Sequence, residues 1–520
     1  MKRRNFLQSS LFASAPFMLN SLPVSALKHK QLFNFFNLEN DKILILIELS
    51  GGNDGLNTVV PLDQYANLFN HRSNIIIPES ALLTMNATNG LHPSMVGMKR
   101  LYDDARLSII QNVGYENQNR SHFRSIDIWN SASAADEYIN TGWMGRYLDQ
   151  NHPTYPDNYP NEDFPDPIAM TIGSLTSDTC QGIGSNFSLA IQNPDNLSAL
   201  PDYGEFQYPD TLYGNELEYL ANSIQQTNAY QEVLTAASEA GTNLSPKYEI
   251  NGSTRLKERL QVIARLISGG LRTKVYITSI GGFDTHSGQV ESNNFAQGTH
   301  AELLFELSDA IEAFQDDLKL QGLEEKVVGM TFSEFGRRIK SNGSLGTDHG
   351  SAAPMFVFGS CINAGVIGNN PTIAAEVANQ EGVAMDYDFK SIYGSILMDW
   401  FEVEESTVRS ILYSDFQYLP IISSCQTTSV DPVEDLGYSI TLSPNPTHGP
   451  VNLDIELDKP EWIKLGVFDT LGAQIKLISN QSLGTGHHLI QFELNDLSTG
   501  IYFVRCQFKN SSKTFRIVKS

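Results

Sequence analysis

The sequence predicts an α/β protein followed by a small antiparallel β-sandwich. Residues 42–55, KILILIELSGGNDG, begin as an almost unbroken apolar run, which is typical of a strand buried on both faces of a parallel sheet. Residues 275–280 and 327–331 repeat the pattern, and each run ends in a glycine-containing or polar turn. After residue 437 the chain changes to short segments of alternating hydrophobicity, which indicate a second, all-β domain.

The first 26 residues predict an export signal. Arg3 and Arg4 precede a moderately apolar stretch that ends in Val24-Ser25-Ala26, a sequence that suits a signal peptidase. The apolar part is too short and too interrupted to span a bilayer, so this protein is not expected to be an integral membrane protein. The adjacent arginines, followed by Phe6-Leu7, resemble a twin-arginine signal, and an ordinary secretory signal is the alternative.

The large domain is expected at residues 41–424. Two further strands are predicted near residues 107–113 and 355–358, and a helix over residues 301–320 should pack one face on the sheet. The apolar stripe of that helix consists of Leu304, Leu307, Ile311, Phe314 and Leu318.

A linker over residues 425–436 separates the two domains, because this segment lacks apolar periodicity and is rich in Ser, Thr, Asp and Pro. The β-sandwich then occupies residues 437–520, with strands expected at 451–457, 463–468, 489–494 and 501–508.

Composition excludes some partners. The formal net charge of −24 makes nucleic acid and anionic membrane poor partners, since both attract clustered Lys and Arg. The four cysteines are scattered without a CxxC pair, which argues against a zinc knuckle or a disulfide framework and leaves a single disulfide open.

Metal-ligating residue types follow the predicted strands. Asp54 comes after the first run, Asp284 and His286 follow the second, and Glu334 follows the third. Carboxylates and imidazoles gathered at the carboxyl ends of strands suit divalent metals. Each residue also has an ordinary interpretation, because Asn-Asp-Gly is a common turn and Glu334 could simply pair with the arginines that follow it.

A candidate nucleophile lies between two cations. Ser121 stands in NRSHFRS, flanked by Arg120 and Arg124, an arrangement that suits an anionic substrate. The alternative is a helix start capped by Ser121. His349, in DHG, enters the predicted sheet from a loop, and His92 is more typical of a packed histidine.

These motifs resemble the family known as domain of unknown function 1501, a twin-arginine-exported member of the alkaline phosphatase superfamily. The matching stretches, in order, are LSGGNDGLNTVVP, GLHPSM, NVGYENQNRSHFRSIDIW, TGWMGRYLD, GGFDTHSGQ, TFSEFGRR and GTDHGSAAPMFVFG. The resemblance implies a three-layer α/β/α fold of alkaline-phosphatase type with divalent metals at strand ends. It implies Ser121 as nucleophile. From their place on either side of Ser121, Arg120 or Arg124 is expected to hold the ester oxygens. The implied metal ligands are Asp54, Asp284, His286, Glu334 and His349.

The chain departs from the superfamily at one strand end. Glu334-Phe335 stands where Asp-His is common, so one metal position lacks an imidazole unless Asp348 or His122 supplies a ligand. A mononuclear site is therefore an alternative. The sulfatase branch is disfavoured because no Cys/Ser-x-Pro-x-Arg pattern is present.

The C-terminal domain resembles the type A sorting domain of the type IX secretion system. The ordered motifs are SPNPTHG at 443–449, FDTLG at 468–472 and LSTGIY at 497–502, with Lys519 near the end. The resemblance implies delivery by that machinery to the cell surface or the medium after periplasmic passage. A carbohydrate-binding or spacer sandwich is the alternative.

The expected function is an exported hydrolase of phosphate or sulfate esters that depends on one or two divalent metal ions, with zinc, calcium or magnesium possible. Its expected partners are an anionic ester and the type IX secretion machinery. The rival hypothesis is a non-catalytic surface or binding protein on a degenerate hydrolase fold. The sequence leaves the substrate, the metal and the oligomeric state open.

Overall fold

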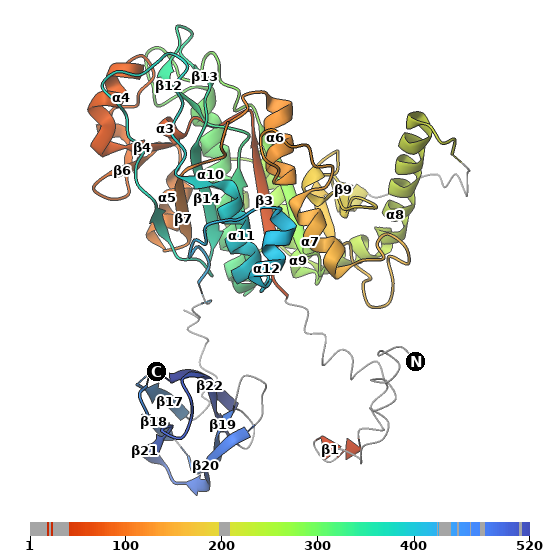
Figure 1. Cartoon of the computed structure of the whole chain (residues 1–520), viewed down its shortest axis with the longest axis vertical. Helices are drawn as coiled ribbons and strands as arrows, with labels where there is room; N and C mark the ends of the chain where they lie inside the picture. The colour runs from red at the N-terminus through yellow and green to blue at the C-terminus, as the bar shows by residue number, and fades with distance from the viewer. Residues whose placement is uncertain are drawn as a thin grey trace. The chain divides into compact units, whose positions relative to one another are not determined.

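The computed structural model describes residues 18–19, 22–23, 41–196, 208–423, 425, 438–444, 447–457, 459–468, 474–508 and 512–519. The chain divides into two compact units, Met1–Gln426 and Thr427–Ser520 (Figure 1). The predicted export signal lies outside the described residues, apart from the short antiparallel pair β1 (Met18–Leu19) and β2 (Leu22–Pro23). The predicted linker also lies outside them, apart from Cys425.

A nine-stranded mixed sheet forms the centre of the large unit, in the order β15-β7-β14-β11-β3-β10-β8-β9, with β16 paired to β7. Central β3 is parallel to both neighbours, β10 and β11. All five strands predicted for the large domain are present. The strands of the sheet are β3 (Ile43–Ser50), β7 (Leu107–Gly114), β8 (Ala169–Ile172), β9 (Ser188–Ile191), β10 (Val275–Gly281), β11 (Val327–Phe332), β14 (Ala353–Gly359), β15 (Gly365–Ile367) and β16 (Tyr387–Asp388).

The sheet is not wholly parallel, because β14 runs antiparallel to β11 and to β7. No helix lies between β11 and β14. The chain instead forms the hairpin of β12 (Arg337–Ser341) and β13 (Thr347–His349) before it enters β14. Without a crossover connection, the returning strand must run in the opposite direction.

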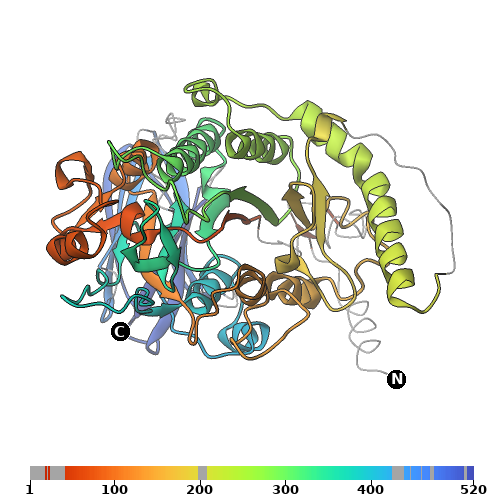
Figure 2. The same cartoon turned by 90° about the horizontal axis from the view of Figure 1, so that it is seen from above.

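Helices cover both faces of the sheet, as the three-layer prediction requires (Figure 2). Alternate residues of β3 separate the two cores, with Ile45 and Ile47 on one face and Leu44 and Leu46 on the other. The first face packs on α5 (Val96–Asp103), α9 (Arg255–Ser268) and α10 (Thr299–Leu320), and the second on α6 (His122–Ser131), α7 (Trp143–Asn151), α11 (Phe389–Asp399) and α12 (Glu405–Leu412). The five predicted stripe residues of α10 are buried in the first core.

The outer part of the large unit adds α3 (Gly55–Thr58), α4 (Tyr65–Arg72) and the long α8 (Leu212–Ala240), together with a small sheet of β4 (Val59–Pro61), β5 (Leu83–Thr84) and β6 (Asn89–Leu91). None of the helices that the structure describes is long and apolar enough to cross a membrane.

The second unit consists of two antiparallel sheets around one core, which confirms the predicted β-sandwich. Its core includes Leu453, Ile455, Ile463, Leu465 and Val504. One sheet has the order β17-β18-β21 and the other β20-β19-β22-β23. Their bounds are β17 (Tyr438–Ser443), β18 (Pro450–Leu457), β19 (Glu461–Phe468), β20 (Gln474–Leu483), β21 (Gly486–Glu493), β22 (Gly500–Gln507) and β23 (Ser512–Lys519).

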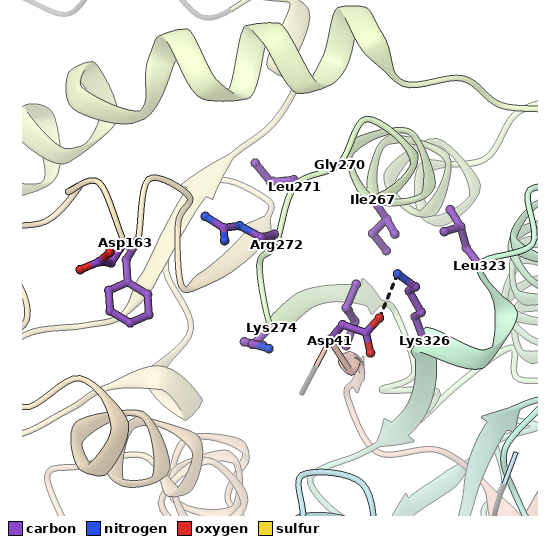
Figure 3. Close-up of a pocket in the computed structure, with 11 residues that line it drawn as sticks. Asp41, Asp163, Ile267, Gly270, Leu271, Arg272, Lys274, Leu323 and Lys326 are labelled. Atoms are coloured by element: carbon purple, nitrogen blue, oxygen red, sulfur yellow. Dashed lines mark ion pairs between the residues drawn. The ribbon is translucent and has the colours of Figure 1, made fainter. Parts of the chain in front are cut away.

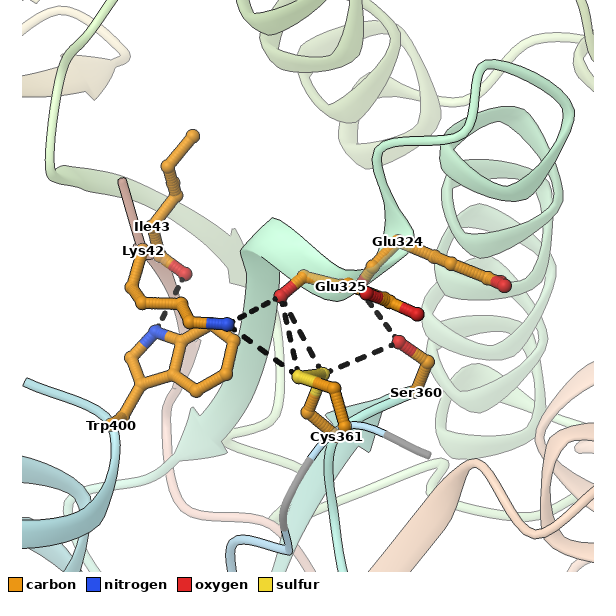
Figure 4. The surroundings of a disulfide bond; sticks show 8 residues. Lys42, Ile43, Glu324, Glu325, Ser360, Cys361 and Trp400 are labelled. Carbon is orange, nitrogen blue, oxygen red and sulfur yellow. Dashed lines mark hydrogen bonds between the residues drawn. A yellow bond between two sulfur atoms is a disulfide. The ribbon is translucent and has the colours of Figure 1, made fainter. Parts of the chain in front are cut away.

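A disulfide ties the end of the large unit to its sheet. Cys361 and Cys425, 64 residues apart, form the single disulfide that the sequence left open, whereas Cys180 and Cys506 are buried free thiols. Beside it, Lys42 donates to the Glu325 carbonyl (3.0 Å) and lies 4.5 Å above the Trp400 ring (Figure 4). The entry into β3 and the exit at Cys425 are therefore joined at the amino-terminal edge of the sheet.

Candidate metal centre

The opposite, carboxyl-terminal edge of the sheet brings most of the predicted ligands together. Because β10 and β11 flank β3 in parallel, the loops that follow all three strands meet at this edge. Asp284 and His286 come from the loop after β10, and Glu334 comes from the loop after β11. His349, at the end of β13, and His122, in the first turn of α6, complete the cluster.

Three side-chain atoms form a small triangle within this cluster. Asp284 Oδ1 lies 3.2 Å from His286 Nε2 and 3.1 Å from His349 Nε2, and the two Nε2 atoms are 2.9 Å apart. Ligands about 2.0–2.1 Å from a tetrahedral metal ion are roughly 3.3 Å from one another, close to these values. His122 belongs to a second overlapping group, because its ligand atom and those of Asp284 and His349 lie within 4.8 Å of one another.

The Nδ1 atom of each imidazole, His286 and His349, faces a hydrogen-bond acceptor. His286 Nδ1 lies 2.9 Å from Asp348 Oδ1, and His349 Nδ1 lies 2.8 Å from the Arg120 carbonyl oxygen. Carboxylate and carbonyl oxygens only accept, so each Nδ1 carries the hydrogen, and in the neutral ring each Nε2 presents a lone pair. Burial lowers the pKa of His349, which favours its neutral form. Two lone pairs facing each other beside a carboxylate are repulsive, and a cation removes the repulsion.

Glu334 and His122 border the triangle. Glu334 is buried, and its Oε2 accepts from the Gly51 amide (2.7 Å) while its Oε1 lies 3.4 Å from His122 Nδ1. His122 Nε2 lies 3.5 Å from Asp284 Oδ2. Glu334 therefore joins the loop after β3 to the first turn of α6, and His122 connects it to Asp284.

Arg337 organises the cluster and was missed as a site residue. Its buried guanidinium donates to Asp284 Oδ1 (2.7 Å) and to the carbonyls of Gly52 (2.7 Å) and Thr347 (2.9 Å), with further bonds to the Gly51 and Phe283 carbonyls. It thus fastens the loop after β3, the loop after β10 and strand β13 together. The sequence offered only its place in FGRR, next to Glu334, whereas its carboxylate partner is Asp284.

Asp54 does not join the cluster. Its carboxylate is fully buried and is held by Arg72 Nη1 at 2.9 and 3.0 Å and by Gln289 Nε2 at 2.6 Å. Burial alone would raise the pKa of Asp54, but the charge of Arg72 and its hydrogen bonds hold that pKa below its usual range. The structure therefore uses the predicted ligand as half of a buried ion pair.

The candidate nucleophile, Ser121, lies between two residues that contact the cluster. Ser121 is the exposed N-cap residue of α6, and its amide donates to Asn119 Oδ1 (2.9 Å). The residues on either side touch the cluster, because the Arg120 carbonyl contacts His349 and the His122 ring contacts Asp284.

Arg124 is used elsewhere. Its guanidinium is buried, donates to the carbonyls of Ala134 (3.1 Å) and Ala135 (3.2 Å), and lies 3.9 Å from the Tyr138 ring centre. These contacts hold the loop after α6. Arg124 therefore has a structural role here, and its guanidinium does not take the expected position at an ester.

A cavity of about 260 Å³ opens at the other end of the sheet, lined by residues that include Ile43, Leu271 and Arg272 (Figure 3). The ion pair of Asp41 and Lys326, at 2.9 Å, lies on its wall. The cavity is at the amino-terminal edge, so it is separate from the candidate metal centre.

Two family models match the chain. Residues 207–394 match the family described as "Protein of unknown function (DUF1501)", and residues 441–520 match the "Secretion system C-terminal sorting domain". The first match contains Asp284, His286, Glu334 and His349 but not Ser121. The second confirms the predicted type IX sorting domain and indicates a protein that is secreted or carried to the cell surface. No curated protein matches the sequence.

Several solved structures are similar to this chain. The PsFucS1 sulfatase from Pseudoalteromonas sp. is 12% identical, with a TM-score of 0.33 over 90% of this chain and 87% of that one. An alkaline phosphatase superfamily protein from Vibrio parahaemolyticus is 11% identical, with a TM-score of 0.31 over 84% and 82%. The phosphonate monoester hydrolase of Silicibacter pomeroyi is 10% identical, with a TM-score of 0.30 over 91% and 88%. At these TM-scores the likeness assigns neither residues nor an activity to this chain.

Proposed function

We propose that the large unit is a metal-dependent hydrolase of phosphate or sulfate esters that the type IX system exports. The observation that carries the proposal is the convergence of Asp284 Oδ1, His286 Nε2 and His349 Nε2 within 3.2 Å of one another. Three protein ligands with room for a fourth are typical of catalytic metal sites. The route before the outer membrane, by a twin-arginine signal and the periplasm, is part of the proposal.

The donor set fits one ion. Two imidazoles and one carboxylate favour zinc or a similar transition metal over calcium and magnesium, which prefer oxygen ligands. Asp54, the carboxylate expected for a second ion, is neutralised by Arg72. We therefore propose a mononuclear centre, with Glu334 and His122 beside it.

The chain's own groups suit attack on an anionic ester. Ser121 is the proposed nucleophile, because its Oγ stands at the amino end of α6, where the helix dipole stabilises negative charge. Arg120 is the proposed holder of the nonbridging oxygens, next to Ser121 and bonded through its carbonyl to His349. A bound divalent metal would neutralise ester charge and lower the pKa of a neighbouring hydroxyl.

The second candidate is a metal-binding protein without catalysis. One observation favours it. Two residues that the sequence predicts for the site, Asp54 and Arg124, are engaged in structural contacts. The two candidates make the same prediction for metal content and opposite predictions for turnover.

Elemental analysis of the purified full chain tests the metal centre. The wild type should carry about one equivalent of metal, and His349→Ala should lose most of it, because one of three ligands is removed. His71→Ala is the matched control, since His71 is a histidine of α4 whose Nε2 contacts the Ala374 carbonyl. A wild type without metal, or equal metal in both variants, would overturn the proposal.

Hydrolysis of p-nitrophenyl phosphate and p-nitrophenyl sulfate then separates the candidates. Ser121→Ala should keep its metal and lose on the order of a thousandfold or more in turnover. Metal-loaded wild type that hydrolyses neither ester would favour the non-catalytic candidate.

A further inference from the structure

Gln289 is a buried residue of the loop between β10 and α10, and it has no role in the function proposed above. Its side chain is 0% exposed and forms hydrogen bonds with Asp54, Thr285 and Thr347. We propose that Gln289 is a positioning residue, which sets the distance between the two segments that carry the candidate metal ligands. The inference rests on the proposed function, because it concerns the metal centre of that function.

The three ligands of the triangle come from two segments, residues 284–286 and 347–349. The segments are in direct contact, because the Thr347 amide donates to the Thr285 carbonyl at 3.2 Å. A Cβ atom on Gly346 would lie 2.5 Å from the Thr285 carbonyl oxygen, so the absence of a side chain at this position allows the close approach. Metal ligands have to be held within about 0.5 Å of their binding geometry, so the groups that fix this contact also fix the site.

The Gln289 amide joins the two segments through their threonine hydroxyls. Its Oε1 lies 3.1 Å from Thr285 Oγ1 and 2.7 Å from Thr347 Oγ1. An amide oxygen only accepts, so both hydroxyls donate to it. Thr285 stands between the two ligands of its segment, and Thr347 stands two residues before the ligand of the other. One buried acceptor therefore holds a side chain from each segment.

The buried ion pair of Asp54 and Arg72 fixes the orientation of that amide. Gln289 Nε2 donates to Asp54 Oδ2 at 2.6 Å, and Arg72 Nη1 holds the same carboxylate. An ionised carboxylate only accepts hydrogen bonds, so the amide nitrogen has to face Asp54 and the amide oxygen has to face the threonines. Asp54, which the sequence predicted as a ligand, thus acts on the centre through Gln289.

The backbone of Gln289 is held separately from its side chain. Its amide donates to the Leu345 carbonyl at 2.9 Å, and its carbonyl accepts from the His300 amide at 3.2 Å. Leu345 lies between β12 and β13, and His300 lies in the first turn of α10. Removing the side-chain hydrogen bonds should therefore leave the loop in place and loosen the contact between the two ligand segments.

Binding of cobalt(II) to the metal-free full chain tests the role, because this ion takes the same kinds of ligand as zinc and its visible spectrum reports the coordination geometry. Gln289→Met has a similar length and cannot form the hydrogen bonds of the amide. It should bind cobalt(II) about tenfold more weakly, the lower end of the range for outer partners of metal ligands, with an altered spectrum. Thr347→Val removes one hydroxyl and should weaken binding about threefold, as for one neutral hydrogen bond. Thr347→Ser keeps the hydroxyl and should bind as the wild type does.

Thr273→Val is the matched control. Thr273 is 0% exposed, like Thr347, and its hydroxyl donates to the Pro167 carbonyl at 2.7 Å, just before β10 begins. The substitution removes the same group from a buried site at the opposite edge of the sheet, so it should lower stability without changing cobalt(II) affinity or the spectrum. Denaturant unfolding of every variant separates a loss of stability from a loss of binding.

The outcomes distinguish this inference from the proposed function. Wild-type affinity and spectrum in Gln289→Met would overturn the positioning role and leave the proposed function standing. Equal affinities of Thr347→Val and Thr347→Ser, or an equal loss in Thr347→Val and Thr273→Val, would overturn it as well. These threonine variants decide alone if Gln289→Met does not fold, because they leave Asp54 its partner. A wild type that binds no cobalt(II) would overturn the proposed metal centre itself.

Discussion

Substituting Asp54 by Asn distinguishes a metal ligand from a structural ion pair. The side chains of Asp54 and Arg72 are both 0% exposed, and Arg72 Nη1 lies 2.9 Å from Asp54 Oδ2. Removing one charge of a buried pair leaves the other without compensation and typically costs about 3–5 kcal/mol. Arg72 keeps its bonds to the carbonyls of Ile339 and Arg338, so we expect the lower part of that range, about 3 kcal/mol.

Denaturant unfolding measures this cost. Trp129, Trp143 and Trp400 are three of the four tryptophans and lie in the large unit, so their fluorescence reports its transition. A double-mutant cycle with Arg72→Met separates the pair from the individual residues. The double variant should be less destabilised than the two single variants added together, because neither charge is then left buried alone.

The reasoning fails if Asp54→Asn unfolds at the wild-type denaturant concentration and loses bound metal. That result would make Asp54 a ligand, with Arg72 displaced from it when metal binds. Wild-type metal content with a clear loss of stability supports the structural assignment and a single metal position.

Three further predictions concern stability, pH and export. Reducing the disulfide of Cys361 and Cys425 opens a loop of 64 residues and should lower the free energy of unfolding by about 4 kcal/mol, seen in denaturant titrations with and without reductant, while metal content stays unchanged. Burial lowers the pKa of His92 to about 3 and that of His300 to about 4, so both are neutral in the folded chain. The unfolded chain takes up protons below about pH 6.5, so stability should be fully present above that pH and fall by about 2 kcal/mol per histidine between pH 7 and pH 5. His92→Gln should flatten this dependence, and an unchanged slope would contradict it. Deleting residues 437–520 should leave a folded large unit in the periplasm, and normal delivery of the truncated chain to the medium would refute the sorting role.

The long apolar runs of the sequence predicted both the strands and most residues of the cluster. Buried strands are long apolar runs, and a residue that directly follows such a run must lie near the edge of the sheet. This rule places Asp284, His286 and Glu334 correctly relative to one another, and it needs no knowledge of the rest of the fold. The reversed direction of β14 depends on the connection before it, which hydrophobic periodicity does not report.

The same reasoning could not assign partners. Asp54 also follows a buried run, yet it is paired with Arg72, the last residue of α4, and nothing in the local sequence of that helix indicates the pairing. Arg337 and Arg124 bind mainly backbone carbonyls, and these bonds require no particular partner side chain. An ion pair, or a hydrogen bond to a backbone carbonyl, forms when two segments meet in the folded protein. The local sequence of either segment therefore contains no pattern that predicts it.

The two edges of the central sheet have different roles in this protein. The disulfide, Lys42 and Trp400 join the entry and exit of the large unit at the amino-terminal edge, and the candidate metal ligands lie at the carboxyl-terminal edge. Because Cys425 is covalently bound to Cys361, the exit point stays fixed on the large unit whatever follows it in the chain. Asp284, His286 and His349 all belong to the large unit, so we expect metal binding not to depend on whether the sorting domain is attached.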